Sequence, residues 1–372
     1  MTRLGWRNLT QSKTRLLISV GGVALSLMLI LSLDAVLAGM ERQISAYIEQ
    51  SGADIWVAQS GVRNLHMVTS SLPGSVVEQI RAVPGVAEVS PLLYVTYPVV
   101  AGGRGRIAYV MGIPGGAAMG GPRQVFSGRR LPAPGQVVLD RSMADFLGVD
   151  LGGTVRIFGR RFQVAGLTEG TSSIGSTLAF IAYADFALLR RSGDTVSFVL
   201  VKTRPGRAPE VVARAIEARA SAVTALPRTT FAVEERRLVK DMGADAVTIM
   251  NTVGFLIGLA AMALTTYTAA LSRRAEYGVL KALGAEARRL YGTVLAQSLI
   301  SVALGFTVAL AATWVLAVIL PVTPVRLVLE ISAGALLKTA AVAMAMTGLA
   351  AVLPIWQIAG LDPALVYRGA GR

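Results

Sequence analysis

The stretch "SRRAEYGVLKALGAEARRLYG", residues 272–292, is a short basic segment between two long apolar ones. It carries five cations and two carboxylates in 21 residues, whereas residues 246–271 before it and 293–320 after it contain no charged side chain. A transmembrane helix needs roughly 20 consecutive apolar residues. Both flanking segments are therefore predicted to cross a membrane, and the basic segment is predicted to connect them outside the bilayer.

Two more segments are long and apolar enough to span a bilayer. Residues 16–40 carry one charge, Asp34, near their far end. Residues 332–356 carry Lys338 about one and a half turns inside, which makes this the weakest span. The whole chain of 372 residues is 53% hydrophobic and only 16% charged, with a mean hydropathy of +0.58. This composition is typical of a membrane protein, and we expect four spans.

A secretory signal peptide is the alternative interpretation of residues 1–40. Its apolar part would be about twice the usual length of roughly 7–15 residues, and no clear A-x-A cleavage site follows it. An uncleaved membrane anchor is therefore the favoured interpretation.

The Lys and Arg residues next to the spans predict the orientation. Cytoplasmic flanks carry an excess of these cations. The N-terminal segment, the segment 272–292 and the tail after the fourth span are basic, whereas Arg326 in the remaining loop is balanced by Glu330. Both termini are therefore expected in the cytoplasm of a cell (inner) membrane protein. The predicted order is a cytoplasmic amphipathic segment (1–15), spans at 16–40, 246–271, 293–320 and 332–356, an extracytoplasmic domain with helical stalk ends (41–245), a cytoplasmic helix (272–292), a short extracytoplasmic loop (321–331) and a cytoplasmic tail (357–372).

The long segment between the first two spans reads as a mixed α/β domain. Residues 154–158 and 161–167 alternate like strands and are predicted to form a hairpin through Gly159–Arg160. Residues 208–220 have helical periodicity. The predicted fold class is an α-helical membrane protein with four transmembrane helices and a large mixed α/β extracytoplasmic domain inserted between helices 1 and 2.

This domain carries no recognisable catalytic motif. The chain has no Cys, which excludes thiol nucleophiles and Cys-ligated zinc, and no metal site is predicted. Its single His, His66, is interpreted as a solvated loop residue rather than as a ligand or a base. The net charge of +14 comes mostly from scattered Arg, so nucleic-acid binding is not expected. We expect no catalytic residue and a binding or scaffolding role.

The two membrane connections of the domain have the pattern of helices that continue out of the bilayer. Residues 41–50 continue the first span with apolar residues on one side, and residues 233–247 approach the second span in the same way. Such stalks could carry motion between the membrane and the domain. Amphipathic flanks that simply pack beneath the domain are an equally good interpretation.

The segment 272–292 itself is compatible with a helix. Arg274, Lys281 and Arg288 recur every seven residues and would share one face. An interfacial helix on anionic lipid headgroups would satisfy this pattern, and on the pattern alone that interpretation is favoured. The largely apolar face offset from the cations consists of Leu280, Leu283, Ala287, Leu290 and Tyr291.

The wording "RRAEYGVLKALGA" (273–285) resembles the cytoplasmic motif of the FtsX/MacB-like permease family. The opening of the chain resembles the family through Asn8, Leu9, Lys13, Arg15 and Leu16, and its end through Pro354, Ala359, Asp362, Pro363, Tyr367 and Arg368. Within this family, the sequence of residues 72–92 most resembles that of the DevC-like branch. In this family the motif is a coupling helix that docks on a partner ATPase. The resemblance therefore implies an ATPase-coupling role for Arg273, Arg274, Glu276, Tyr277, Gly278, Val279, Leu280, Lys281, Ala282, Leu283 and Gly284.

The resemblance also implies what the chain does. It would be the membrane subunit of an ABC-type complex that transmits mechanical work, and two copies would form a homodimer. The complex would export a lipid, lipoprotein, peptide or small toxic molecule, and a periplasmic adaptor could be a further partner. The sequence lacks a Walker A motif, so ATP and Mg²⁺ are expected on a separate ATPase and no cofactor on this chain. A regulator that activates an outside partner, such as a cell-wall hydrolase, is the alternative.

Small and charged residues inside the spans give two further expectations. Asp34 and Lys338 are expected near an interface or facing protein, with a proton or substrate path as the alternative. Small residues permit close helix contacts, either within one bundle or between two copies. The candidates for helix packing are Gly22, Ser26, Gly254 and Gly258.

Overall fold

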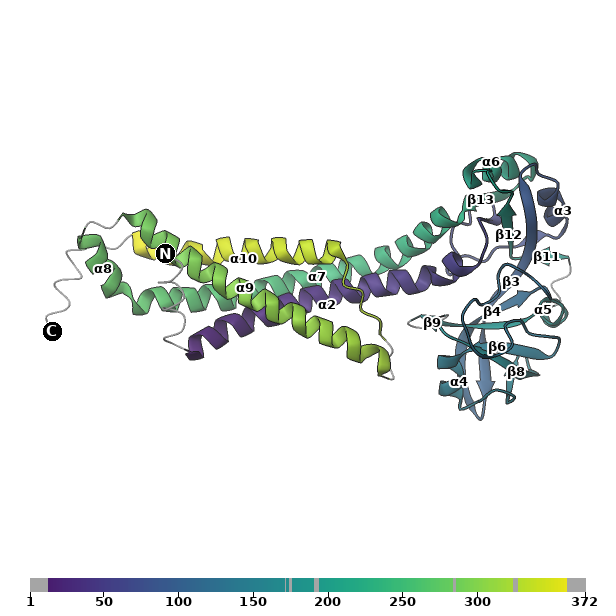
Figure 1. Cartoon of the computed structure of the whole chain (residues 1–372), viewed down its shortest axis with the longest axis horizontal. Coiled ribbons are helices and arrows are strands. Elements are labelled where there is room, and N and C mark those ends of the chain that lie inside the picture. The colour runs from purple at the N-terminus through teal and green to yellow at the C-terminus, as the bar shows by residue number, and fades with distance from the viewer. Residues whose placement is uncertain are drawn as a thin grey trace. The chain divides into compact units, whose positions relative to one another are not determined.

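The computed structural model describes residues 13–170, 172–173, 176–190, 194–283, 286–323 and 327–359. It consists of two compact units, one built from Met1–Gly39 and Met242–Arg372 and the other from Met40–Asp241 (Figure 1). The predictions that concern residues 1–12, Gly284 and residues 360–372 lie outside the described residues. The first unit is helical, and the second is mixed α/β.

Four long helices of the described residues are apolar enough to cross a membrane: α2 (Lys13–Gln50), α7 (Arg228–Ser272), α9 (Ala287–Ile319) and α10 (Ala333–Ala359). A short 3-10 turn, η1 (Leu320–Val322), follows α9. The predicted fold class is confirmed. Each of α2 and α7 is one continuous helix that is longer than the span predicted inside it, and the span limits themselves stay predictions.

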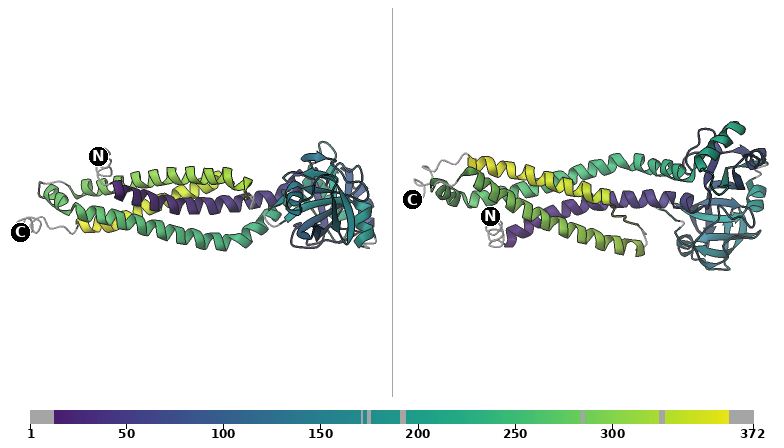
Figure 2. Two further views of the ribbon diagram at one scale, coloured as in Figure 1. Left: turned by 90° about the horizontal axis from the view of Figure 1, so that it is seen from below. Right: turned by 45° about the horizontal axis from the view of Figure 1, so that its top comes forward.

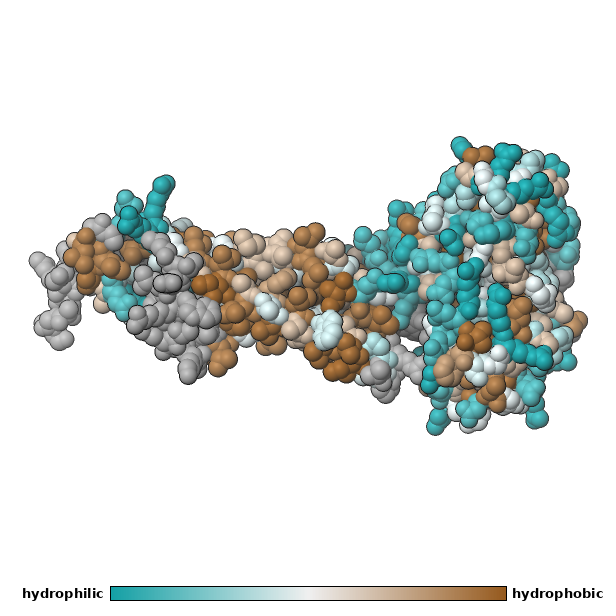
Figure 3. Space-filling model, viewed as in Figure 1, coloured by the Kyte–Doolittle hydropathy of each residue, from teal (hydrophilic) through white to brown (hydrophobic). Residues whose placement is uncertain are grey.

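All four long helices contribute to an apolar core in the helical unit. They lie alongside one another in the views of Figures 1 and 2. On the face shown in Figure 3, hydrophobic residues gather over these helices, whereas hydrophilic residues are frequent on the α/β unit. The core consists of Val23, Leu27 and Ile30 from α2, Met262 from α7, Val302 and Ala309 from α9, and Ala343, Met346 and Ala350 from α10.

The small residues singled out in the sequence lie at the contact between α2 and α7. A methyl group added at Gly258 would lie 2.6 Å from Ser26 Oγ, and one added at Gly22 would lie 2.9 Å from the Cβ of Ala261. At Gly254 it would approach Leu29 to 3.3 Å. These residues therefore serve packing within one chain, where they let two helix backbones approach closely.

The α/β unit is built around one large sheet. In the described residues the strand order along its main path is β13-β1-β12-β3-β4-β10-β6-β8-β5, and β2 pairs with β11 separately. The elements are β1 (Ile55–Gln59), β2 (Leu72–Pro73), α3 (Ser75–Arg81), β3 (Val86–Ala101), β4 (Arg104–Ile113), β5 (Val125–Gly128), β6 (Gln136–Asp140), α4 (Arg141–Leu147), β7 (Thr154–Ile157), β8 (Arg160–Thr168), β9 (Ser172–Ser173), β10 (Ser176–Ala182), α5 (Tyr183–Arg190), β11 (Thr195–Val196), β12 (Phe198–Thr203), α6 (Pro209–Arg219) and β13 (Val223–Pro227).

The long strand β3 joins the two halves of this sheet. Its first part pairs with β12, as in Leu92↔Phe198, and its second part pairs with β4 from Leu93 to Ala101. Strand β1 lies between β12 and β13 and is antiparallel to both. The strands nearest in space to β1 therefore come from the far end of the domain sequence.

The predicted hairpin is present, but its turn lies one residue earlier than expected. Ile157 pairs with Arg160, so the two turn residues are Phe158 and Gly159, with φ of 51° and 76°. A two-residue turn of this kind requires positive φ at both positions, which the sequence rule assigns to glycine rather than phenylalanine. The centroids of the Phe158 and Tyr97 rings lie 4.3 Å apart, so the side chain at this turn position packs against the sheet.

Candidate functional site

The predicted coupling segment contains a short helix, α8 (Arg274–Ala282). The helix is shorter than the predicted range 272–292, because Leu283 lies in a turn and α9 begins at Ala287. Arg288 therefore belongs to a different helix, and the prediction of one face shared by Arg274, Lys281 and Arg288 is wrong. Glycine is a poor helix former, and the sequence places Gly284 two residues after the end of α8.

One face of α8 is anchored to the helical unit. Tyr277 is only 8% exposed and packs in a cluster with Ala270 of α7, Leu290 and Val294 of α9, and Ala351 of α10. Burial raises the pKa of the Tyr277 phenol, against the opposing effects of the Arg273 charge and a hydrogen bond with the Thr293 side chain. The phenol therefore stays protonated, and its ring fixes α8 against three helices.

The opposite face of α8 is open. Val279 and Leu280 are each 44% exposed, and Leu283 in the following turn is 80% exposed. Glu276 is exposed beside them, with one oxygen 3.9 Å from Arg273 Nη1. We call Glu276, Val279, Leu280 and Leu283 the outer face of α8. Apolar side chains grouped beside a charge in this way are typical of a surface that binds a protein or a membrane.

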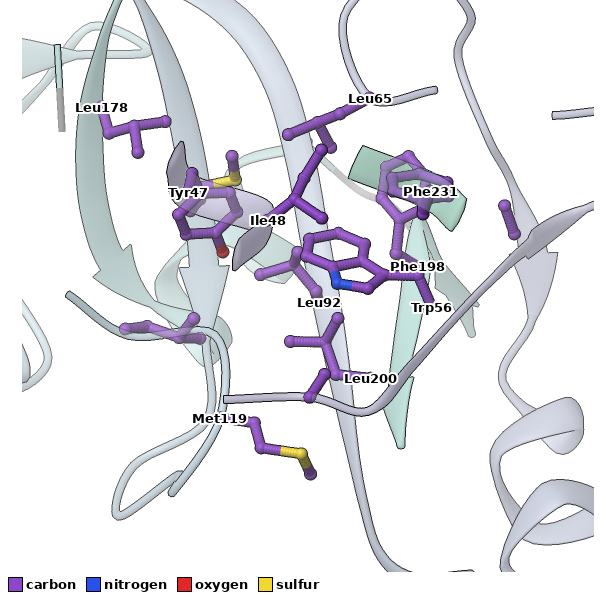
Figure 4. Close-up of a cluster of buried hydrophobic side chains, with 14 of the residues drawn as sticks. Tyr47, Ile48, Trp56, Leu65, Leu92, Met119, Leu178, Phe198, Leu200 and Phe231 are labelled. Atoms are coloured by element: carbon purple, nitrogen blue, oxygen red, sulfur yellow. The ribbon is translucent and has the colours of Figure 1, made fainter. Parts of the chain in front are cut away.

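In the α/β unit, the ends of α2 and α7 are part of the domain core (Figure 4). Phe231 of α7 stacks on Trp56 of β1 with ring centroids 5.1 Å apart and an interplanar angle of 9°. Tyr47 of α2 meets the same Trp56 ring edge-on at 5.9 Å, and its hydroxyl donates to the Gly120 carbonyl over 2.8 Å. The root cluster comprises Tyr47, Ile48, Trp56, Leu65, Leu92, Phe198, Leu200 and Phe231.

Polar contacts also join the two helix ends and the loop that follows β1. Arg228 donates to the Glu49 carbonyl over 3.0 Å, and Arg236 forms an ion pair with the Glu49 carboxylate over 3.1 Å. Glu235 of α7 accepts from the Leu65 backbone N–H over 2.5 Å and contacts His66 Nδ1 with its other oxygen. The helix ends are therefore fixed to each other and to the sheet. Amphipathic flanks that only pack beneath a domain would not form these contacts within its core.

His66 is not a solvated loop residue, so that prediction is wrong. Its side chain is 10% exposed, its partner Glu235 is fully buried, and its ring lies 4.5 Å from the Tyr109 ring. The two residues are 169 positions apart. No local sequence pattern signals such a pair. The one hint in the sequence is Glu235 itself, an acidic residue at an apolar position of the helical periodicity near the start of α7.

Asp34 and Lys338 form an ion pair inside the helical unit. Lys338 Nζ and Asn251 Nδ2 each lie 3.0 Å from Asp34 Oδ1, which joins α10 and α7 to α2. The backbone N–H of Glu330 also donates to the Ala35 carbonyl over 2.9 Å. Charges inside spans are costly unless they are paired. Asp34 is 11% exposed and faces protein as expected, whereas the Lys338 side chain is 52% exposed and only its Nζ atom reaches Asp34. Asn251 is a member that sequence reasoning missed.

Two family models together match nearly the whole chain. The MacB-like periplasmic core domain matches residues 16–219, and the FtsX-like permease C-terminal domain matches residues 248–363. The chain belongs to the FtsX/MacB-like permease family. It is a multi-pass membrane protein and an ABC transporter permease of this type, which implies an ATPase partner.

Relatives of similar length carry the same description. Proteins of Mycobacterium bovis and Mycobacterium tuberculosis named as uncharacterized ABC transporter permeases are 23% identical over 365 residues, which is 98% of this chain and 98% of theirs. Among solved structures, the periplasmic region of MacB from Actinobacillus actinomycetemcomitans is 17% identical with a TM-score of 0.38 and covers 50% of this permease and 94% of that chain. The extracellular domain of the transporter YknZ from Gram-positive bacteria is 15% identical with a TM-score of 0.36, covering 47% and 99%.

The structure divides the predicted coupling residues of this permease into two sets. Tyr277 and Gly278 are buried against the helical unit, and Lys281 donates to the Ala359 carbonyl over 3.2 Å. Arg273 is half-buried. The remaining described residues are exposed: Arg274, Glu276, Val279, Leu280, Ala282 and Leu283.

Proposed function

We propose that this permease transmits an ATP-driven conformational change from a separate ATPase to an extracytoplasmic α/β domain, for the export of a lipid, lipoprotein, peptide or small toxic molecule. The observation that carries this proposal is the root cluster. Phe231 and Tyr47 belong to helices that continue as predicted spans, yet both are core residues of the α/β unit. Close-packed cores transmit displacement because they have no free volume to absorb it.

The second observation that supports this proposal is the outer face of α8, where the ATPase would dock. An ATPase docked on Glu276, Val279, Leu280 and Leu283 would cover apolar surface that otherwise meets water. A push on this face would reach α7, α9 and α10 through the buried Tyr277. ATP and Mg²⁺ would bind the ATPase, and this chain would contribute no catalytic residue. We further propose a dimer of two permease copies in the cell membrane, with cytoplasmic termini, and contacts with lipids and a periplasmic adaptor.

The docking proposal is tested by Leu280→Asp in the full permease co-expressed with its ATPase. A carboxylate on the outer face is expected to reduce co-purification at least tenfold while membrane insertion stays normal, because the charge would be buried at the interface without a partner. Leu188→Asp is the matched control, since Leu188 is a 71% exposed leucine of the α/β unit. Co-purification at the wild-type level by Leu280→Asp would show that α8 only lies at the lipid surface.

A second measurement separates export from regulation. The ATPase rate of the purified complex is expected to rise with an exported small molecule, lipid or peptide. A rate that rises only with a protein partner, such as a cell-wall hydrolase, would replace export by regulation. Either outcome requires that motion reach the α/β unit, so both depend on the root cluster.

A further inference from the structure

The α/β unit contains a cavity for which the proposed transmission gives no role. Its volume is about 260 Å³. Three different elements form its walls, namely the loop after β1, the middle of β3 and the last residue of α5. The lining residues are His66, Met67, Val68, Thr69, Tyr94, Val95, Thr96 and Arg190.

The His66 side chain in this cavity is held in a fixed orientation. Glu235 contacts its Nδ1 atom, and the Tyr109 ring packs against it edge-on. Nε2 is therefore the remaining polar atom of the ring. A ligand in the cavity would therefore meet the His66 ring through this one atom.

The other polar groups of the cavity are suited to an anion. Arg190 brings a guanidinium, which binds carboxylate and phosphate oxygens in bidentate fashion. The hydroxyls of Tyr94 and Thr96 lie 3.3 Å apart, and burial raises the pKa of the Tyr94 phenol, so this group keeps its hydrogen and can donate. The described lining residues include no carboxylate.

The lining also includes two exposed apolar residues. Met67 is 60% exposed and Val68 is 45% exposed, and both belong to the loop that also carries His66. The volume lies below the roughly 300–1,000 Å³ of sites for drug-sized ligands, so the cavity fits a headgroup and a few carbon atoms. A ligand with an anionic end beside Arg190 and an apolar body against Met67 would match both kinds of lining residue.

We propose that this cavity binds a carboxylate or phosphate group carried on a short apolar chain. Arg190 pairs with the anion, the Tyr94 and Thr96 hydroxyls donate to it, His66 forms part of the wall, and Met67 and Val68 cover the apolar part. This assignment does not depend on the proposed transmission.

A consequence for α7 does rest on the proposed function. The wall of the cavity is held by Glu235, and Glu235 lies on the helix whose Phe231 stacks in the root cluster. A ligand that contacts His66 in this wall therefore favours the observed packing of α7. By linkage, the position of α7 then changes the affinity for the ligand by the same factor.

The binding test uses the full permease in lipid nanodiscs with hexyl phosphate and hexanoate as probes. Hexanol and hexyltrimethylammonium serve as neutral and cationic controls, and empty nanodiscs give the lipid background in saturation-transfer NMR. At least one anion is expected to bind while both controls do not, and the two anions distinguish a phosphate from a carboxylate site. Binding of hexanol as tight as that of the anions would overturn the proposal.

Arg190→Gln is expected to weaken binding at least tenfold. Arg190 is exposed, so this variant is expected to fold. Arg214→Gln on α6 is the matched control and is expected to bind as the wild type does. Unchanged binding by Arg190→Gln would overturn the site.

The ATPase rate of the reconstituted complex then tests the link to α7. A change in rate on adding the bound anion, absent in Arg190→Gln, supports the link. An anion that binds without changing the rate overturns the link and leaves the site intact. A rate that does not depend on the permease at all contradicts the proposed function and not the binding site.

Discussion

The root cluster and α8 are both places where a predicted span leaves its bundle, yet they are built differently. In the root cluster, aromatic rings from α2, α7 and the sheet cover one another completely, and Trp56 and Phe231 are almost fully buried. On α8, only Tyr277 and Gly278 are buried, while Val279, Leu280 and Leu283 face outward. The first region is completed by its own chain, whereas the second presents apolar surface that a partner can cover.

The largest effect is expected in the root cluster. Phe231→Ala removes the ring that stacks on Trp56 and is expected to lower the free energy of unfolding by about 3–5 kcal/mol. The thermal midpoint of the full permease in nanodiscs reports the change. Leu188→Ala, which truncates an exposed side chain, is the control and is expected to be nearly neutral. Equal shifts for both variants would show that the cluster does not hold α7 to the sheet.

The next largest effect is expected where α2 and α7 touch. Gly258→Leu would force a side chain into the space of Ser26, so the helices must separate or rotate. We expect a lower thermal midpoint and a lower ATPase rate of the complex. Gly21→Leu is the matched control, because nothing lies within 4 Å of a methyl group added there. A tolerated Gly258→Leu would contradict the close α2–α7 contact.

A moderate effect is expected from the ion pair between Asp34 and Lys338. Asp34→Asn and Lys338→Met each leave the other residue without its counter-charge, while the double variant removes both charges. The double-mutant cycle, measured on thermal midpoints, is expected to give a coupling of about 0.5–3 kcal/mol. Additive single effects would mean that the contact contributes nothing to the association of α2 and α10.

The smallest effect is expected at the anchored face of α8. Tyr277→Phe keeps the buried ring and loses the hydrogen bond with Thr293, which is worth about 0.5–1.5 kcal/mol. Co-purification with the ATPase is expected to be unchanged, in contrast to Leu280→Asp. A loss of co-purification by Tyr277→Phe would indicate that the phenol, and not the outer face, contacts the partner.

The features of the fold that could be predicted are those that follow from local sequence patterns. Four helices follow from length and hydropathy alone, and the continuous α2 and α7 follow from periodicity that extends past the apolar segments. The failures are non-local. His66 meets Glu235 across 169 residues, and the parallel pairing of β10 with β4 joins strands that are distant in sequence. Phe158 adopts a glycine-like φ, and its ring packs against Tyr97, which is distant in sequence.

The candidate site was predicted to a similar extent. The residues of α8 follow from the wording of the motif, but their division into an anchored and an open face depends on the packing of α9 and α10 against Tyr277. The end of α8 before Arg288 was missed because a seven-residue repeat of cations carries no signal for where a helix ends. The pairing of Asp34 with Asn251 and Lys338 required three helices to be assembled.

The position of β1 between β12 and β13 has a consequence for biogenesis. Trp56 is made early, but its neighbours Phe198 and Phe231 are made about 140 and 175 residues later. Until they are synthesised and translocated, the edge of β1 has no strand to pair with and is open to other chains. The domain therefore completes its core only when the second hydrophobic helix reaches the translocation machinery, which couples its folding to the insertion of that helix.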